Sequence, residues 1–452
     1  MTEQTPPGDS SSSHALALFT CASNARTPLN CRKVSKDIRD ASDFHRKSLM
    51  LQRETPDLDS IRSLLTRHLT NLYLSCTEVT DLSALASCTG LTSLRMSSCL
   101  NVSDVSPLAS CTGLRELNLS NTHKVADLSV LASCNRLTSL IMACCLNVSD
   151  VSPLASCTGL RELNLRATMV ADLSPLASCT GLANLNIQYT PVSDLSPLAH
   201  CTGLTKLTML LNDFPVSALA NCPRLISLDL SGTKVDDLSE LANCTGLTSL
   251  DLSETNVADL SALGNCTGLT KLDLTFSGVS VADLSVLASS CTRLTRLDLS
   301  DNELVDLSPL RSCTALTRLD LSDNKVVDLS PLASCTALTW LDLKGSEVAD
   351  LSALANCTGL TYLKLHGTKV TDLSPLANCT GLTILELDRT NVTDVSALAS
   401  CTALTWLDLR ATKVTDVSAL ASCTALTRLH LRATKVTDLS PLANCPGLTI
   451  EY

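Results

Sequence analysis

The sequence predicts an α/β solenoid in which one short unit, a strand followed by a turn and a helical segment, is repeated along most of the chain. Two observations predict this fold class. A pattern of about 22 residues, LxxLxLxxT/NxVxDLSxLxxCTG, recurs along the chain, and repetition at such a period is typical of solenoids. Aromatic residues make up only 2% of the 452 residues, which fits a small leucine core copied many times better than three independent domains.

Each repeat begins at a leucine, and this leucine sets the register of the whole unit. Seventeen complete units can be aligned, followed by a broken one at Leu448. Two units deviate: the unit from Leu204 contains Pro215, and the unit from Leu269 carries three extra residues at 278–280, for which we expect a loop. The complete units begin at Leu69, Leu91, Leu114, Leu137, Leu160, Leu182, Leu204, Leu225, Leu247, Leu269, Leu294, Leu316, Leu338, Leu360, Leu382, Leu404 and Leu426.

The order of residue types within a unit predicts its local structure. The leading LxxLxL alternates apolar and polar positions, which predicts a short strand. A Thr or Asn then turns the chain. In the phrase Leu-Ser-Pro-Leu-Ala the serine suits a helix N-cap and the proline suits the first helical position, so one short helical or 3₁₀ turn should follow. Cys-Thr-Gly returns the chain to the next strand.

This pattern closely resembles the leucine-rich repeat family in its 22-residue SDS22-like and internalin-like form. The phrase Asp-Val-Ser-Pro-Leu at 104–108 is also similar to certain protozoan leucine-rich repeat proteins. The resemblance implies a horseshoe or arc with parallel strands on the concave face and short helical or 3₁₀ turns on the convex face. It also implies a non-enzymatic scaffold or regulatory subunit that binds a partner protein on the concave face. SDS22-like relatives regulate a Ser/Thr phosphatase, so a phosphatase or another signalling protein is one expected kind of partner.

The ends of the chain depart from the repeat. Residues 1–40 are rich in Ser, Thr and Pro at first and are predicted to be disordered. Residues 41–68 are predicted to form a helical N-terminal cap, with a helix from Ser42 to Glu54. Residues 69–452 form the predicted solenoid of 17 complete units plus a partial last strand. That last strand would present an unpaired edge, through which two copies of the chain could associate.

Cysteine is unusually frequent, and its placement is regular. Seventeen of the 23 cysteines occupy one slot of the repeat, from Cys88 to Cys445. We interpret the slot as a buried column in which Cys acts as a small hydrophobic residue. A metal or redox ladder is the alternative, but no histidine joins the column. Of the other cysteines, Cys76 and Cys144 are predicted to be exposed thiols. So many thiols favour a reducing compartment.

Charge and motifs exclude several function classes. The net charge of −11 disfavours nucleic-acid binding. No apolar run is long enough to span a membrane, and no basic stretch precedes the short apolar segment at 15–19, so we expect neither a membrane segment nor a signal peptide and predict a cytoplasmic protein. We find no catalytic motif, and we predict no enzyme activity, no cofactor and no metal site.

The strand positions between the leucines should face solvent on the concave side. The slot between the second and third leucines holds six consecutive aspartates. One interpretation is that they only record duplication of the phrase LDLS; the others are an acidic strip for a basic partner and a calcium ladder. These aspartates are Asp229, Asp251, Asp273, Asp298, Asp320 and Asp342.

The slot before the second leucine becomes apolar and aromatic near the C-terminus. Large aromatic side chains on a rigid sheet are typical of interface hot spots, so we predict partner contact there. The alternative is that the tryptophans only pack across their neighbours and stabilise the last units. The predicted partner-binding residues are Trp340, Tyr362, Ile384, Trp406, Asp298, Asp320, Asp342, Lys364, His366, Asp408, Arg410 and Arg428.

Three other functional classes stay open. A surface or secreted receptor or adhesin of the leucine-rich repeat type would need a signal peptide that this sequence does not show. A substrate-receptor-like adaptor of a ubiquitin ligase would use the same concave face. A self-assembling structural protein would instead use the edge of the last strand.

Overall fold

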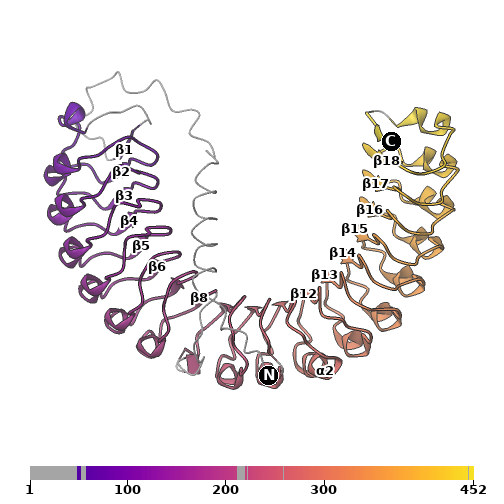
Figure 1. The fold of residues 1–452 in the computed structure, drawn as a ribbon, viewed down its shortest axis with the longest axis horizontal. Helices are drawn as coiled ribbons and strands as arrows, with labels where there is room; N and C mark the ends of the chain where they lie inside the picture. The colour runs from indigo at the N-terminus through magenta and orange to yellow at the C-terminus, as the bar shows by residue number, and fades with distance from the viewer. Residues whose placement is uncertain (1–47, 52–57, 211–218, 221, 258, 446) are drawn as a thin grey trace, which may run out of the picture. The chain divides into compact units, whose positions relative to one another are not determined.

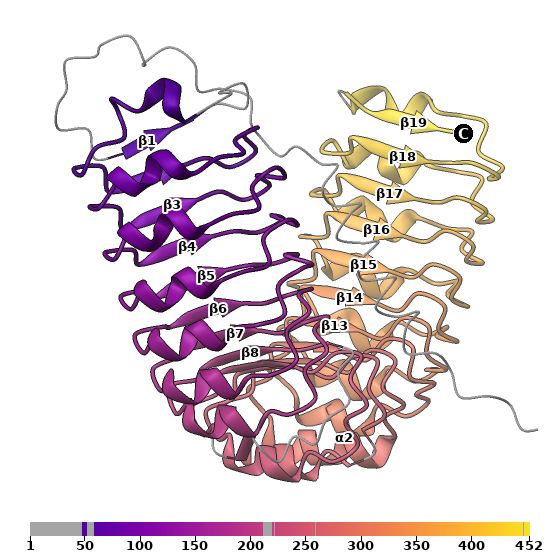
Figure 2. The same ribbon diagram turned by 60° about the vertical axis from the view of Figure 1, so that its left-hand side comes forward.

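The computed structural model describes residues 48–51, 58–210, 219–220, 222–257, 259–445 and 447–452. The chain divides into two compact units, Met1–Asp229 and Leu230–Tyr452, which we call the first and the second unit. Within each unit the strands lie along one side and the 3₁₀ turns along the opposite side, as Figures 1 and 2 show. The predicted disorder of residues 1–40 lies outside the described residues.

Parallel strands of three residues form the sheet of each unit, and consecutive strands pair in chain order, for example β2 with β3 and β14 with β15. The first unit contains β1 (Ser48–Met50), β2 (Asn71–Tyr73), β3 (Ser93–Arg95), β4 (Glu116–Asn118), β5 (Ser139–Ile141), β6 (Glu162–Asn164), β7 (Asn184–Asn186), β8 (Lys206–Thr208) and β9 (Ser227–Asp229). The second unit contains β10 (Ser249–Asp251), β11 (Lys271–Asp273), β12 (Arg296–Asp298), β13 (Arg318–Asp320), β14 (Trp340–Asp342), β15 (Tyr362–Lys364), β16 (Ile384–Glu386), β17 (Trp406–Asp408), β18 (Arg428–His430) and β19 (Thr449–Glu451).

Between the strands lie 3₁₀ helices, mostly of five residues. They are η1 (Asp59–Ile61), η2 (Ser83–Ser87), η3 (Ser106–Ser110), η4 (Ser129–Ser133), η5 (Ser152–Ser156), η6 (Ser174–Ser178) and η7 (Ser196–His200) in the first unit. In the second unit they are η9 (Ser239–Asn243), η10 (Ser261–Asn265), η11 (Ser308–Ser312), η12 (Ser330–Ser334), η13 (Ser352–Asn356), η14 (Ser374–Asn378), η15 (Ser396–Ser400), η16 (Ser418–Ser422) and η17 (Ser440–Asn444).

Where a 3₁₀ helix begins with serine, an aspartate two residues earlier in the chain fixes the start of the helix. In the repeat that contains η13, the Asp350 carboxylate accepts hydrogen bonds from the backbone N–H of Ser352, at 2.8 Å, and from the Ser352 hydroxyl. Asp372 and Ser374 repeat this arrangement at 2.8 and 2.7 Å. The sequence predicts that serine is the N-cap, whereas in the structure the serine donates and the aspartate supplies the accepting oxygen.

The core is a stack of leucine rows closed by the cysteine column. Leu341, Leu343 and Leu354, for example, are fully buried, as are the equivalent leucines of the neighbouring units. Every cysteine in the described part of the chain is a free thiol, and those of the column are buried. Cys357 donates a weak hydrogen bond, with 3.6 Å between Sγ and O, to the carbonyl of Cys335 in the preceding repeat. This agrees with the interpretation of the column as buried small hydrophobic residues.

The predicted helix from Ser42 to Glu54 is wrong where it can be checked. Ser48–Met50 forms β1, which pairs with β2 and places Leu49 opposite Leu72. Leu49 and Leu51 are buried while Met50 is exposed, which is the two-residue period of a strand. The segment is therefore an atypical first repeat, hidden because Arg46 stands where the leading leucine is expected. Residues 41–47 and 52–57 of the predicted cap lie outside the described residues.

Two further expectations need correction. The extra residues at 278–280 do not simply form a loop. They lead into α2 (Val281–Ser290), a ten-residue α-helix that replaces the 3₁₀ helix of its repeat. Ser280 and Asp283 form a capping box at its start, which explains why a full helix begins there. Cys144 is 5% exposed and therefore buried, so the prediction of an exposed thiol is wrong for this residue. Association through β19, which pairs with β18, stays a prediction.

Candidate protein-binding site

The four residues predicted as the apolar part of the site lie in one line across four neighbouring strands. Trp340 on β14 is the direct register partner of Tyr362 on β15, which pairs with Ile384 on β16, which pairs with Trp406 on β17. Adjacent strands lie about 4.8 Å apart, so their side chains are within reach of one another. We call these four residues the aromatic row.

Stacking orders the first half of the row. The rings of Trp340 and Tyr362 lie nearly parallel, at 11°, with their centroids 5.0 Å apart. The guanidinium of Arg318 lies over the other face of Trp340, 3.4 Å from the ring centroid, which is a close cation–π contact. The Tyr362 hydroxyl donates a hydrogen bond of 3.2 Å to Glu386. Burial and this nearby carboxylate raise the pKa of Tyr362, so the hydroxyl stays protonated and donating.

The second tryptophan is held in a similar way at the other end. His430 on β18 stacks on Trp406 at 6.0 Å and 30°, and the Arg428 guanidinium lies 5.9 Å from the Trp406 ring centroid. The indole N–H of Trp406 is buried and has no hydrogen-bond partner among the described residues. Both tryptophans are therefore packed against a cation and an aromatic ring.

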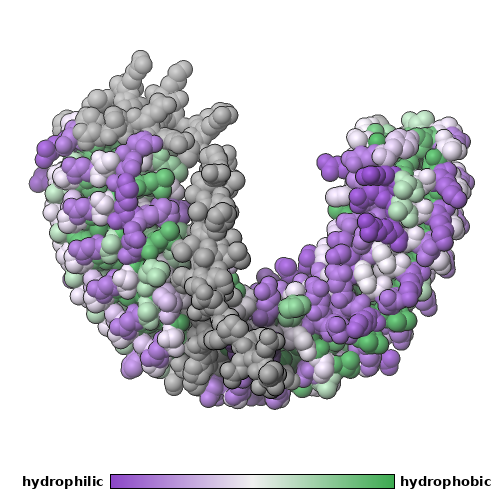
Figure 3. Space-filling view, viewed as in Figure 1, coloured by the Kyte–Doolittle hydropathy of each residue, from purple (hydrophilic) through white to green (hydrophobic). Residues whose placement is uncertain are grey.

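The aromatic row is half-buried rather than freely exposed, which corrects the sequence expectation. All four side chains have intermediate exposure. The rings of Trp340 and Tyr362 cover one another, and His430 covers part of Trp406. Packing across neighbours, which the sequence analysis offered as the alternative, thus does occur. It leaves part of each residue accessible on the strand side of the second unit. There, Figure 3 shows a mainly hydrophilic surface with scattered apolar side chains.

The aspartate column runs beside the start of the row. Asp273, Asp298 and Asp320 are register partners on β11, β12 and β13. Asp320 accepts hydrogen bonds from the backbone N–H and the hydroxyl of Ser322, at 3.0 and 2.7 Å. None of the three carboxylates forms an ion pair within the described part of the chain, and the guanidinium of the nearby Arg318 lies over the Trp340 ring instead.

Crowding on the strand side changes the protonation of this column. Burial, reinforced by the negative charges of Asp298 and Asp342, raises the pKa of Asp320 to about 6. Burial also raises the pKa of Asp273, with Asp298 and Asp251 adding to the effect. Asp273, Asp298 and Asp320 therefore carry charge that no ion pair among the described residues neutralises.

Farther along the same slot, the carboxylates are buried and paired, so the expectation that they face solvent is wrong there. Asp342 is 6% exposed and Asp408 only 1%. Lys364 lies 3.5 Å from Asp342 and 3.9 Å from Glu386, so the two carboxylates share one positive charge. Arg410 binds Asp408 at 2.6 Å. These carboxylates lie underneath the lysine and arginine side chains, which become the accessible groups.

The remaining predicted residues join this ion-pair network. His366 contacts Asp388 through its Nδ1 at 2.5 Å, and Arg410 approaches the same carboxylate at 3.7 Å. The predicted site left out three residues that contribute to it: Glu386 and Asp388 in the ion pairs, and Arg318 in the stack on Trp340. Each of the three occupies a repeat position that the sequence already predicts to face the strand side. Extending each row of predicted residues by one repeat would therefore have included them.

Among the residues that the structure describes, no three His, Cys, Asp or Glu side chains come together in an arrangement that could hold a metal ion. The same part of the chain contains no helix long and apolar enough to cross a membrane.

Two descriptions of repeat families match this chain. The family description "BspA type Leucine rich repeat region (6 copies)" matches residues 68–182 and 178–290, and "Leucine Rich repeats (2 copies)" matches residues 292–334. No curated protein sequence matches the chain.

Three solved structures illustrate the likeness. An internalin (inlF) from Listeria monocytogenes is 29% identical, with a TM-score of 0.59 over 71% of this chain and 88% of its own. The functional domain of InlJ from the same organism, described as including a cysteine ladder, is 22% identical, with a TM-score of 0.62 over 76% of this chain and 72% of its own. The leucine-rich repeat ectodomain of the plant membrane receptor kinase GASSHO1 from Arabidopsis thaliana, in complex with CASPARIAN STRIP INTEGRITY FACTOR 2, is 18% identical, with a TM-score of 0.57 over 89% of this chain and 60% of its own. The repeat, the parallel strands with 3₁₀ turns and these matches agree: the chain belongs to the leucine-rich repeat proteins.

Proposed function

We propose that this chain is a protein-binding module whose partner docks on the aromatic row of the second unit. Leucine-rich repeat domains are generally interaction scaffolds without enzyme activity, and the GASSHO1 ectodomain was solved in complex with a bound factor. The proposal places a partner over β14–β17, with a phosphatase or another signalling protein as one kind of partner.

The observation that carries the proposal is the stack of Arg318, Trp340 and Tyr362. Rings at 5.0 Å with a guanidinium at 3.4 Å on the outer face are ordered before any partner arrives. An interface made from side chains that are already ordered loses less conformational entropy on binding. Tryptophan, tyrosine and arginine are also the residues most enriched at interface hot spots.

Charge suggests what the partner should carry. Asp298 and Asp320 lie next to the row without ion pairs among the described residues, whereas Lys364 and Arg410 are already neutralised by carboxylates. A segment with apolar side chains followed by Lys or Arg would cover the row and place its cations beside the two aspartates. Complementary charge of this kind raises the association rate and selects among partners.

Removal of both tryptophans tests the proposal. Wild-type protein and the Trp340→Ala/Trp406→Ala variant are used as bait for native extracts, and the partner recovered by the wild type is identified by mass spectrometry and then purified. We expect the double variant to bind that purified partner at least ~10-fold more weakly, because hot-spot aromatics contribute about 2 kcal/mol or more each. Isothermal titration calorimetry gives the dissociation constants.

Phe276→Ala is the matched control, because Phe276 is also in the second unit and is 67% exposed outside the strands. It removes an exposed aromatic ring and should leave the affinity unchanged. Circular dichroism confirms that each variant is folded. Equal affinity of wild type and folded double variant would refute the proposal.

The compartment is part of the proposal. We place the protein in the reducing cytoplasm, because a column of free buried thiols needs no oxidation to be stable. A second candidate, a surface or secreted receptor or adhesin, is favoured by the 29% identity with an internalin. Fractionation of the cells that produce the protein, followed by protease treatment of intact cells, distinguishes the two: digestion from outside would establish the second candidate.

A further inference from the structure

The first unit contains two nearly identical copies of one stretch, which provide a comparison within the molecule. Residues 91–119 and 137–165 differ at three positions only: Arg95 is replaced by Ile141, and residues 97 and 98 change with it. The copies place the same side chains on neighbouring strands. Ser93 on β3 and Glu116 on β4 recur as Ser139 on β5 and Glu162 on β6.

In the first copy the carboxylate of Glu116 is held by two groups. The Ser93 hydroxyl donates to Oε2 at 3.0 Å, and the guanidinium of Arg95 lies 3.8 Å from the same oxygen. The guanidinium of Arg95 also lies over the Tyr73 ring on β2, 5.6 Å from the ring centroid. An arginine and a glutamate thus occupy adjacent slots as an ion pair.

In the second copy the same carboxylate lacks its cation. The Ser139 hydroxyl donates to Glu162 at 2.8 Å, just as Ser93 donates to Glu116. Ile141 stands where the first copy has Arg95, so Glu162 has no ion pair among the residues that the structure describes. A carboxylate offers about four lone-pair sites, and one hydroxyl leaves most of them unused.

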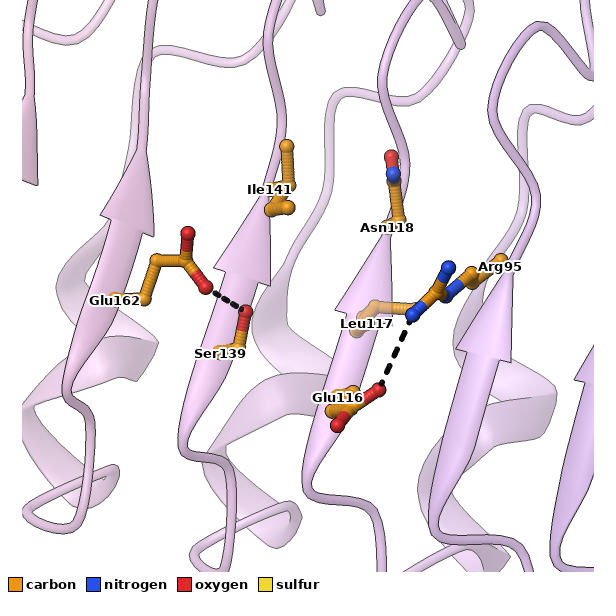
Figure 4. A pocket seen from close by; sticks show the side chains of 7 residues that line it. All are labelled: Arg95, Glu116, Leu117, Asn118, Ser139, Ile141 and Glu162. Atoms are coloured by element: carbon orange, nitrogen blue, oxygen red, sulfur yellow. Dashed lines mark hydrogen bonds and ion pairs between the residues drawn. The ribbon is translucent and has the colours of Figure 1, made fainter.

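A pocket lies at this place. Its volume is about 270 Å³, and Figure 4 shows it between the strands of β3 to β6. Ser139 is short and lies between the two longer glutamates, so the surface is hollow above it; Asn118 and Ile141 form the neighbouring edge. The lining residues are Arg95, Glu116, Leu117, Asn118, Ser139, Ile141 and Glu162.

We propose that this pocket accepts one arginine side chain from a partner protein, whose guanidinium binds Glu162 in place of the arginine that the second copy lacks. The planar guanidinium matches a carboxylate with two parallel hydrogen bonds. The methylene groups of the partner's arginine would pack on Ile141. This isoleucine supplies apolar surface that Arg95 does not supply in the first copy. The site belongs to the first unit and does not depend on the aromatic row.

Two glutamates flank the pocket, and they explain the preference for a cation over an anion. Glu116 and Glu162 carry two negative charges against the single positive charge of Arg95, which is already committed to Glu116. The exposed position limits the strength of each ion pair, because solvent screens it. The pocket therefore adds specificity for an arginine at one position of a partner rather than most of the affinity.

Ligand-observed saturation-transfer NMR with the full-length protein tests the proposal. The probe is the capped tripeptide acetyl-Gly-Arg-Gly-amide, compared with the same peptide carrying citrulline, which keeps the shape but has no charge. We expect saturation transfer to the arginine peptide and several-fold less to the citrulline peptide. Glu162→Gln should reduce the arginine signal several-fold, and Glu78→Gln, which removes an exposed carboxylate of the same unit, should leave it unchanged.

The internal copy supplies two further variants. Ile141→Arg restores the arginine of the first copy and should abolish the signal, because the pocket is then filled from within the chain. Arg95→Ile makes the first copy resemble the second and should increase the signal by freeing Glu116. Equal transfer to the citrulline peptide, or an unchanged signal in folded Ile141→Arg protein, would overturn the proposal. Neither result bears on the aromatic row.

Discussion

Two rows of aspartates run through the second unit, and their carboxylates behave in opposite ways. At the turns, Asp328, Asp350 and Asp372 each accept hydrogen bonds from a serine two residues later, and these bonds lower the pKa of each carboxyl. On the strand side, burial raises the pKa of Asp273 and Asp320. The same residue type in the same repeat thus stabilises the fold at one position and opposes it at the other.

The difference shows which aspartates the fold requires. A lowered pKa means that the charged form is more stable in the folded chain than in the unfolded chain, so the turn row contributes to stability. A raised pKa means the reverse. Asp273 and Asp320 also accept hydrogen bonds from the residue two positions later, but burial outweighs these bonds, so folding on balance favours the neutral carboxyls. Contact with a cationic partner would favour the charged form. This comparison supports the proposal that the partner carries Lys or Arg beside the aromatic row.

The largest effect should follow from removing the turn row. We expect the triple variant Asp328→Ala/Asp350→Ala/Asp372→Ala to lower the midpoint of thermal unfolding by roughly 5 °C or more, because three successive 3₁₀ turns lose the acceptor of their first N–H. Differential scanning calorimetry measures the midpoint. Hydrogen exchange should show faster exchange at the amides of Ser330, Ser352 and Ser374.

The control for the turn row is the triple Asp→Asn variant at the same positions. Asparagine keeps one accepting oxygen but carries no charge, so its midpoint should lie between those of the wild type and the alanine variant. A midpoint equal to that of wild type in the alanine variant would show that the serine–aspartate bonds do not hold the turns.

A smaller effect of opposite sign should follow on the strand side. Asp320→Asn removes a charge whose burial is unfavourable and keeps an oxygen for the Ser322 N–H, at present 3.0 Å from Asp320. At pH 7.5 we expect the free energy of unfolding to rise by about 1 kcal/mol, well below the full value implied by the pKa, because the carboxylate is partly exposed and screened. Urea unfolding monitored by circular dichroism gives the value, and a decrease would contradict the comparison.

The smallest effect concerns pH. Since the folded pKa of Asp320 is about 6 and the unfolded value is 3.8, its protonation contributes stability that is fully present below pH 3.8 and is lost as the pH rises through 6. The difference in stability between Asp320→Asn and wild type should therefore vanish as the pH falls from 7.5 to 4. A difference that stays constant over this range would exclude Asp320 as its source.

The turn row dominates at lower pH. Its carboxyls have lowered folded pKa values, so their contribution is present above the unfolded pKa and is lost as the pH falls through the folded values. The wild type and the Asp320→Asn variant should therefore lose stability in parallel below about pH 4, because both keep the turn row.

Most of the fold could be predicted from the sequence because each leucine has one structural role. The two-residue spacing of Leu341 and Leu343 requires a strand, and seventeen copies fix the register. The prediction failed where a single residue concealed the pattern: Arg46 occupies the leading leucine position, and β1 was mistaken for a helix. It also failed at α2, because whether three extra residues loop out or extend a helix depends on the capping pair Ser280 and Asp283.

The candidate site was predictable in its position but not in its packing. Register placed Trp340, Tyr362, Ile384 and Trp406 in one line, since strand pairing follows directly from the repeat. The burial of Asp342 was not predictable, because it depends on which rotamer lets Lys364 cover it. The pocket beside Glu162 was visible in the sequence as one substitution between two copies, but its meaning required the distance between Arg95 and Glu116.

The cysteine column has a consequence for how the molecule can be observed. Burial raises the pKa of the Cys201 thiol to about 12 and that of Cys357 to about 11, so in the folded chain these thiols are almost unreactive. In the described part of the chain, most repeats carry one such buried thiol, and only the repeats that begin at Leu91 and Leu137 carry more. Opening of a single repeat would therefore expose the thiol of that repeat. Because stability in a repeat array is distributed between neighbours, the order in which the cysteines react with an alkylating reagent records where the array opens first. The chain thus contains its own position-specific reporters of local unfolding.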